Sequence, residues 1–330
     1  MWWRSLIFMG AFFGALLAAV PNVLWLVGAL AGKVFSYRLP YAPFGWTAAG
    51  LVLLLWGCLA YGHFVGRFRA EVKQVEYSSP EVPPSFDGYR IVQISDLHVD
   101  SFQRPEALRR VTDLANAQGA DIILFTGDVV TGAMEGILPH EAALHSLHAP
   151  DGVLSVLGNH DFFIYDRDLH SDAQRSAMAD RLASYERDTL GWNVLRNASC
   201  IIRRGADSIA VAGVDNINGN QGFRTIQKGD LAAAMRSLDG VFTVLMSHDP
   251  GHWRAEVLPK SHAQITLSGH THAAQVRLLG WSPANLMFDE CDGRYDEDGR
   301  MLYVNAGTGC TAPVRIGCPS EVTVITLRHI

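Results

Sequence analysis

The stretch ITLSGHTHAAQV, residues 265–276, places two histidines just after an apolar run that is typical of a β-strand. His270 and His272 stand two positions apart, and side chains at positions i and i+2 of an extended chain point to the same face. Gly269, which has no Cβ, lets another group approach the backbone closely just before them. The stretch therefore predicts two imidazole rings directed toward one point, which is a metal site only if other parts of the chain supply partners.

Polar residues of the same kind follow four other apolar runs of the chain. Open α/β sheets place their functional sites where strands end and loops begin, so these positions are candidates for one site. Taken singly, each motif is as well explained by an ordinary turn or loop, but five such clusters together predict a shared metal site. The four motifs are VQISDLHVD with Asp96 and His98, LFTGDVV with Asp128, VLGNHDF with Asn159, His160 and Asp161, and LMSHDP with His248.

Strand-like and helical patterns alternate through the polar part of the chain, from about Tyr89 onward. A helix is expected over residues 105–118, because Pro105 suits a first helical turn and Gly119 suits the position just past the end. Short β-rich runs dominate the later part. The pattern predicts a layered α/β domain with mixed sheets.

The ordered series SDLH, GDVV, GNHD, SHD and GHTH resembles that of the calcineurin-like metallophosphoesterases. The resemblance extends from Arg90 to the C-terminus. The closing segments YVNAGTG and PVRIGCPSEVTVITL are similar to those of the bacterial membrane-associated phosphodiesterase branch. The resemblance implies a four-layer αββα sandwich, in which two packed β-sheets are flanked by helices.

The resemblance also implies two metal ions that share the carboxylate of Asp128. One ion would be held by Asp96, His98, Asp128 and His272, and the other by Asp128, Asn159, His248 and His270. Two divalent ions can polarise phosphoryl oxygens and generate a bridging hydroxide that attacks in line. Carboxylate, amide and imidazole ligands without thiolate suit Mn, with Fe, Zn and Ni as alternatives.

His160 and Asp161 stand beside these ligands in the sequence. The resemblance implies that His160 binds a phosphoryl oxygen or protonates the leaving group, a role that imidazole suits near neutral pH. Asp161 is interpreted as the group that orients His160, and a loop-capping carboxylate is the alternative. Ala273 and Ala274 depart from the branch, which more commonly has two glycines there, and their methyl groups are expected to disfavour positive φ.

The first seventy residues contain five basic residues and no acidic residue, and the first acid is Glu71. Removing those five from the total of 27 basic residues leaves 22 against 33 acidic residues, so the rest of the chain carries about −11. Residues 5–32 and 44–65 are apolar and long enough to cross the ~30 Å hydrocarbon core as helices. We therefore predict a transmembrane hairpin over residues 1–70, a linker over 71–88 and a catalytic domain over 89–330.

Two spans place both chain ends on one side of a bilayer, and a bacterial inner membrane is expected. Arg4, Arg67, Arg69 and Lys73 lie on that side, against Lys33 and Arg38 in the connecting loop. The positive-inside rule then favours a cytoplasmic catalytic domain. A cleaved signal peptide is the alternative, because residues 29–31 read Ala-Leu-Ala, but the apolar stretch is long for a signal and a second span follows.

The expected function is that of a membrane-anchored phosphodiesterase or pyrophosphatase with two metal ions. A lipid-linked phosphate such as UDP-2,3-diacylglucosamine is the expected substrate, since tethering confines the site to the bilayer surface. A nucleotide or nucleic-acid phosphodiesterase is one alternative, although the acidic soluble part offers no evident basic surface for nucleic acid. A non-catalytic membrane scaffold is another, but all the ligand positions of the motifs are present.

Overall fold

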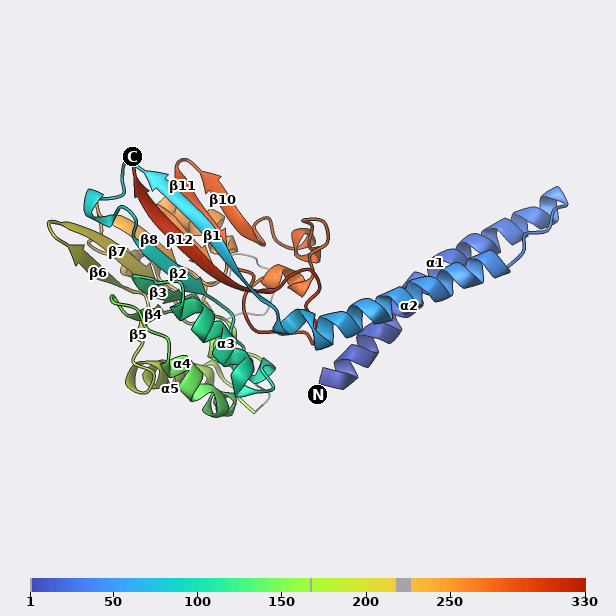
Figure 1. The fold of residues 1–330 in the computed structure, drawn as a ribbon, viewed down its shortest axis with the longest axis horizontal. Helices are drawn as coiled ribbons and strands as arrows, with labels where there is room; N and C mark the ends of the chain where they lie inside the picture. The colour runs from blue at the N-terminus through green and yellow to red at the C-terminus, as the bar shows by residue number, and fades with distance from the viewer. Residues whose placement is uncertain (1, 167, 218–226) are drawn as a thin grey trace. The chain divides into compact units, whose positions relative to one another are not determined.

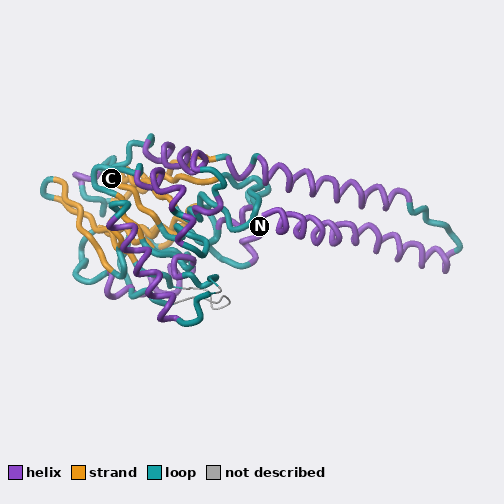
Figure 2. Tube along the Cα trace, turned by 90° about the horizontal axis from the view of Figure 1, so that it is seen from below, coloured by secondary structure: helices purple, strands orange, loops and turns teal. Residues whose placement is uncertain are grey.

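Two long apolar helices open the chain in the computed structural model, which describes residues 2–166, 168–217 and 227–330. Helix α1 runs from Trp2 to Phe35 and α2 from Ala42 to Phe64, and they lie side by side (Figure 1, Figure 2). Both are long and apolar enough to cross a membrane, as the sequence predicts. Helix α1 continues through Pro21 without a break.

Residues 312–317 join the two helices in one structural unit, and the rest of the chain forms a second unit. Within the first unit, Gly62 and Gly66 allow the backbone of this loop to approach the end of α2. A Cβ atom on Gly66 would stand 2.0 Å from the carbonyl oxygen of Arg315. The His63 Nδ1 atom lies 2.7 Å from the carbonyl oxygen of Pro313. The loop is therefore fitted against the end of α2 and the turn that follows it, where these two positions have no room for side chains.

The second unit contains two mixed six-stranded sheets (Figure 1). The first sheet has the order β1-β12-β2-β3-β4-β5 and the second has the order β10-β11-β9-β8-β7-β6. The strands of the first are β1 Ala70–Ser79, β2 Arg90–Ile94, β3 Ile122–Phe125, β4 Val153–Ser155, β5 Asn193–Val194 and β12 Ser320–His329. Those of the second are β6 Ala198–Arg204, β7 Asp207–Gly213, β8 Phe242–Met246, β9 Ile265–Ser268, β10 Gly293–Glu297 and β11 Arg300–Val304.

Alternate residues of the inner strands point into two different cores. Ile122 and Leu124 join a cluster that includes Val244 and Leu267 of the second sheet, so this core lies between the sheets. Ile123 and Phe125 face the other way, into a cluster that includes α3 and α5 residues. Strands buried on both faces are expected to be apolar throughout, which explains the continuous apolar runs in the sequence.

Helices cover the outer face of each sheet and complete the four layers expected from the sequence. Residues of α3, α4 and α5 pack on the first sheet, and residues of α6 and of the turn of π-helix Trp253–Val257 pack on the second. The helices are α3 Pro105–Asn116, α4 Glu141–His145, α5 Asp172–Asp188, α6 Leu231–Ala234 and α7 Leu258–Lys260.

The segment predicted as a linker differs from the expectation in its first half. Residues 71–79 belong to β1, which pairs in parallel with β12 along its whole length, from Ala70 with Ser320 to Ser79 with His329. The catalytic unit therefore begins at Arg69 rather than at Tyr89. The prolines at 80, 83 and 84 follow this strand, and Pro80 restricts Ser79 to the extended conformation that the strand already has.

Candidate metal centre

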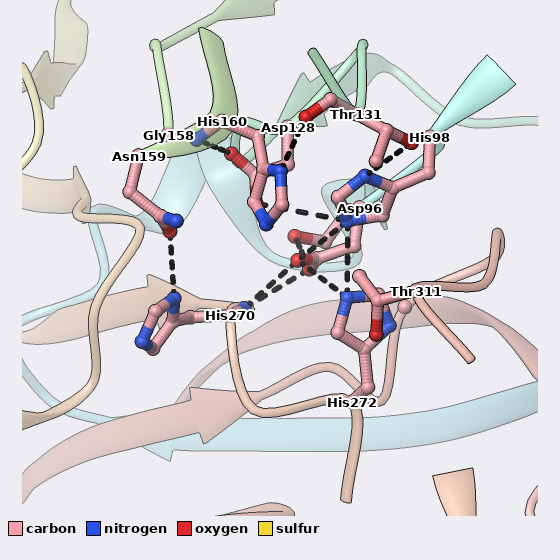
Figure 3. A network of polar contacts seen from close by, with 12 residues as sticks. Asp96, His98, Asp128, Thr131, Gly158, Asn159, His160, His270, His272 and Thr311 are labelled. Carbon is pink, nitrogen blue, oxygen red and sulfur yellow. Dashed lines mark hydrogen bonds and ion pairs between the residues drawn. The ribbon is translucent and has the colours of Figure 1, made fainter. Parts of the chain in front are cut away.

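The five motifs found in the sequence meet at one place, where strands of both sheets end. Figure 3 shows residues of four of them, SDLH, GDVV, GNHD and GHTH. Strands β2, β3 and β4 end at Ile94, Phe125 and Ser155, and strands β8 and β9 end at Met246 and Ser268. Each motif lies in the loop that follows its strand. The topology thus brings together residues that are up to 176 positions apart, from Asp96 to His272.

One side of this centre is formed by Asp96, His98 and His272, whose ligand atoms all lie within 4.8 Å of one another. The Nε2 atoms of His98 and His272 are 3.1 Å apart. The His272 Nε2 atom lies 3.3 Å from Asp96 Oδ1. These distances correspond to the first predicted ligand group, and the Asp128 carboxylate, 3.7 Å from His98 Nε2, completes it.

The other side is formed around Asn159 and His248. The His248 Nε2 atom lies 3.1 Å from Asp128 Oδ2 and 3.1 Å from Asn159 Oδ1. The His270 Nδ1 atom lies 2.8 Å from the same Asn159 oxygen. Asp128 therefore stands between the two groups, which is the place that the predicted bridging role requires.

Two carboxylates buried close together cost free energy unless a cation balances their charge. Asp96 and Asp128 are both buried, and the attraction of His248 only partly offsets the burial that raises the pKa of Asp96 to about 6. Burial alone would lower the pKa of His248, but the carboxylate of Asp128 outweighs it and raises that pKa to about 10. A proton on His248 thus balances charge in the metal-free chain, and a divalent cation can take its place.

The protonation of His98 also fits metal binding. Burial, aided by the nearby charge of His160, lowers the pKa of His98 to about 3, so its imidazole is neutral and able to ligate. The Nδ1 atom of His248 lies 2.8 Å from the carbonyl oxygen of Thr126, which leaves its Nε2 atom directed into the centre. The donor set of carboxylate, amide and imidazole fits two divalent cations, and the predicted ligands remain candidates for holding them.

The backbone at the centre is unusual. Five of the seven candidate ligands have positive φ: Asp96 (51°), His98 (40°), Asp128 (62°), His270 (72°) and His272 (50°). Such conformations cost free energy in residues other than glycine and gather at functional sites. They also correct the expectation drawn from strand alternation. Strand β9 ends at Ser268, so the two histidines reach the centre through a tight loop and not through an extended chain.

Ala273 and Ala274 extend this loop in the same left-handed region, with φ of 49° and 48°. Both residues therefore adopt positive φ in spite of their methyl groups, where the sequence favoured a different conformation. The loop holds them there: the Ala274 N–H donates to the carbonyl oxygen of Thr271 at 2.8 Å, and the Val276 N–H donates to that of Ala273 at 3.2 Å.

Two glycines let these loops come close to one another. A Cβ atom on Gly269 would stand 2.2 Å from Asp96 Oδ2, and one on Gly158 would stand 2.2 Å from Asp128 Oδ1. Side chains at these positions would displace the two central carboxylates. The close approach that the sequence suggested at Gly269 is thus an approach of the Asp96 loop.

His160 lies at the rim of the centre and is partly exposed. Its Nδ1 atom is 2.6 Å from the carbonyl oxygen of Thr131, and its backbone N–H donates to Asp128 Oδ1 at 2.9 Å. Its ring lies 4.7 Å from that of His98, between ring centroids. The side chain is therefore oriented by Thr131, and His160 also forms a group with His98 and Asp128 whose ligand atoms all lie within 4.8 Å of one another.

Asp161 is fully buried and binds backbone rather than the His160 ring, as far as the described residues show. Its Oδ2 atom accepts from the N–H groups of Asp128, at 2.6 Å, and Gly158, at 2.9 Å. Its Oδ1 atom accepts from Val130 at 3.3 Å. These contacts favour the alternative reading of a loop-capping carboxylate, which ties the GDVV loop to the GNHD loop.

Two contributors to the centre were not predicted. Ser95 Oγ donates to Asp96 Oδ2 at 2.5 Å, and Thr131 Oγ1 lies 3.3 Å from His98 Nδ1 while its carbonyl contacts His160. Ser95 is the first residue of the SDLH motif and Thr131 directly follows GDVV, and these positions were the signal that the sequence offered. A cavity of about 390 Å³ is lined in part by Phe288, whose ring centroid lies 5.7 Å from that of His270.

Carboxylates and imidazoles gathered at the ends of strands in two stacked mixed sheets define a metal-dependent hydrolase. Residues 89–274, more than half of the chain, match the family model described as calcineurin-like phosphoesterase. The chain belongs to the calcineurin-like phosphoesterase family, and it is a metal-dependent phosphoester hydrolase. The family binds two divalent metal ions.

Several relatives are similar over most of the chain. The uncharacterized metallophosphoesterase YkuE of Bacillus subtilis is 29% identical over 86% of this chain and 94% of its own length. The UDP-2,3-diacylglucosamine pyrophosphatase LpxG of Chlamydia trachomatis is 26% identical over 77% of this chain and 88% of its own. A transmembrane protein with metallophosphoesterase domain from Danio rerio is 26% identical over 84% of this chain and 62% of its own.

Proposed function

We propose that this chain is a membrane-anchored phosphodiesterase or pyrophosphatase whose substrate is a lipid-linked phosphate. The observation that supports the chemistry best is the placement of Asp128 between the two groups of candidate ligands. UDP-2,3-diacylglucosamine is the specific candidate, since a relative that is similar over most of the chain is named as its pyrophosphatase.

The residues of the centre have distinct roles in this proposal. Asp96, His98, Asp128 and His272 hold one divalent cation, and Asp128, Asn159, His248 and His270 hold the other, with Mn²⁺ as the proposed metal. When bound, such a pair supplies Lewis-acid stabilisation of phosphoryl charge and a water of lowered pKa. His160 donates a hydrogen bond or a proton to the phosphoryl group or leaving oxygen. Asp161 fixes the positions of the two loops that carry Asp128 and Asn159.

The anchor supports a lipid substrate. Helices α1 and α2 each have the length of a span, so the proposal places the chain in the membrane as a hairpin. The basic residues flanking the two helices favour a bacterial inner membrane with the catalytic unit in the cytoplasm. A substrate confined to the same bilayer meets a tethered site at a far higher local concentration than a soluble one does.

A panel of substrates tests this proposal. The full chain, purified in detergent and loaded with Mn²⁺, is incubated with UDP-2,3-diacylglucosamine, phospholipids, cyclic nucleotides and single-stranded DNA, and products are identified by mass. We expect lipid turnover that falls by about 10²- to 10⁴-fold in His160→Ala. The matched control is His145→Ala, because His145 is exposed on α4.

Each other outcome points to a different function. Turnover of nucleotides or DNA alone would contradict the lipid substrate and favour the nucleotide phosphodiesterase. Binding of both metals without any turnover on the panel would favour the scaffold. Equal loss of activity in His160→Ala and His145→Ala would contradict the role given to His160.

A further inference from the structure

Residues 278–286 form an exposed loop of unusual composition, which we call the apolar loop. It reads LLGWSPANL and contains no charged residue. Leu279 is fully exposed, and the exposed fractions of the other large residues are 58% for Leu278, 49% for Trp281 and 78% for Leu286. Contiguous exposed apolar side chains on a soluble surface mark a site of interaction.

The turn at the tip of this loop displays a leucine that does not contribute to the core. Leu278 and Trp281 pair through two backbone hydrogen bonds of 2.8 and 3.0 Å, which close a two-residue turn over Leu279 and Gly280. Both turn residues have positive φ, 52° and 83°, a conformation that normally selects asparagine, aspartate or glycine. A leucine is unfavourable at the positive φ of position 279, and its side chain is fully exposed. The stability of the fold therefore does not explain why a leucine stands there.

The loop is fixed directly beside the metal centre. The Ser282 hydroxyl donates to the carbonyl oxygen of Ala273, in the same loop as His270 and His272. Ser282 also caps the short helix Pro283–Leu286, and Ala284 is buried. The turn at Leu279 and Gly280 is thus held beside the metal centre. A surface that binds this turn would therefore lie next to the metal centre.

The short connection between the predicted membrane span and the catalytic unit indicates which surface the apolar loop can reach. Only five residues separate the end of α2 at Phe64 from the start of β1 at Ala70. At about 3.3–3.6 Å per extended residue, the catalytic unit begins within roughly 20 Å of the end of the span. Leucine and tryptophan without charge suit the interface between lipid chains and headgroups, where tryptophan is enriched.

We propose that the apolar loop inserts into the interfacial layer of the bilayer and holds the mouth of the metal centre against it. The membrane would supply the surface that Leu279 and Trp281 lack within the chain. The inference rests on the membrane anchor and not on the identity of the substrate, so its test contains no substrate.

Quenching of tryptophan fluorescence by brominated lipids tests the insertion. The full chain is placed in phosphatidylcholine nanodiscs with ordinary or brominated acyl chains, and Trp281→Phe is subtracted from the wild type to isolate the emission of Trp281. We expect this emission to be lost in brominated nanodiscs and to resist iodide added to the water. Trp253→Phe is the control, because Trp253 is buried in the core and its emission should resist both quenchers.

Two results would overturn the inference. Quenching of Trp281 by iodide, with none by brominated lipid, would show that the loop faces water. Resistance to both quenchers would show that protein covers the loop, as in contact with a second copy. As a second variant, Leu279→Asp should restore Trp281 emission in brominated nanodiscs, and unchanged quenching in that variant would contradict insertion led by the tip of the turn.

Discussion

Ala274 carries a conformational cost that a single substitution can remove. Its side chain is exposed and its φ is 48°, a region in which a non-glycine residue is disfavoured by roughly 1–2 kcal/mol. Glycine also increases the conformational entropy of the unfolded chain, and this offsets about 0.4–1 kcal/mol of the stabilisation gained by relieving the strain. Ala274→Gly is therefore expected to raise the free energy of unfolding by about 0.5–1 kcal/mol.

Thermal unfolding of the detergent-purified protein measures this change. Ala273→Gly is the matched comparison, because Ala273 has nearly the same φ but is buried, so that removal of its methyl group also loses packing. The midpoint should rise more for Ala274→Gly than for Ala273→Gly. A lower midpoint for Ala274→Gly would mean that the loop does not hold the left-handed conformation.

Asp161 is expected to act through the positions of two loops. In Asp161→Asn, one of the two oxygens becomes an amide NH₂ group, which cannot accept from the backbone N–H groups of Asp128, Gly158 or Val130. A buried donor left without an acceptor costs about 1–3 kcal/mol. Loss of partners that orient metal ligands typically weakens metal binding by about 10- to 100-fold.

Metal affinity and thermal stability should therefore fall together in Asp161→Asn. Isothermal titration of the metal-free protein with Mn²⁺ gives the first quantity. Asp113→Asn serves as the control, since Asp113 pairs with Arg109 on the exposed surface of α3. Wild-type metal affinity in Asp161→Asn would show that these hydrogen bonds do not position Asp128.

At the scale of elements, the end of α2 and the loop of residues 312–317 fit without room for a side chain. A Cβ atom on Gly66 would meet the carbonyl oxygen of Arg315 at 2.0 Å, whereas one on Gly57, in the middle of α2, would meet nothing within 4 Å. Gly66→Val should displace the loop, and overpacking of this kind costs typically about 1–3 kcal/mol. Gly57→Val should not displace it.

Limited trypsin digestion in nanodiscs reports on this loop, because Arg315 is fully buried and protected. We expect cleavage after Arg315 to become faster in Gly66→Val and to stay at the wild-type rate in Gly57→Val. Equal protection of Arg315 in both variants would contradict the packing of the loop on α2.

The elements show where sequence patterns succeed and where they do not. Apolar runs predicted β2, β3, β8 and β9 because strands buried on both faces admit few polar residues. Strand β1 was placed outside the catalytic domain, and its sequence, AEVKQVEYSS, is largely polar, as suits an edge strand with partly exposed residues. Its pairing with β12 joins residues about 250 positions apart, and no local pattern reports such a partner.

The candidate centre was predictable as a set of residues but not as a geometry. The residues were identified by motif type and order, whereas no motif reports the positive φ of His270 and His272, or the distant contact by which the His270 N–H donates to the Asp96 carboxylate. The same holds for Asp161, whose neighbours in the chain suggested His160 as its partner. Its backbone partners at Asp128 and Val130 appear only when the two loops are folded together.

At the scale of the whole molecule, the proposed hydrolysis requires two divalent cations held around Asp128. The full chain is stripped of metal, titrated with Mn²⁺ and assayed for bound metal and for hydrolysis of bis(4-nitrophenyl) phosphate. We predict that turnover appears as two equivalents bind, that Asp128→Asn loses both binding and turnover, and that Asp113→Asn keeps them. Turnover in the metal-free protein, or binding of two equivalents by Asp128→Asn, would contradict the account.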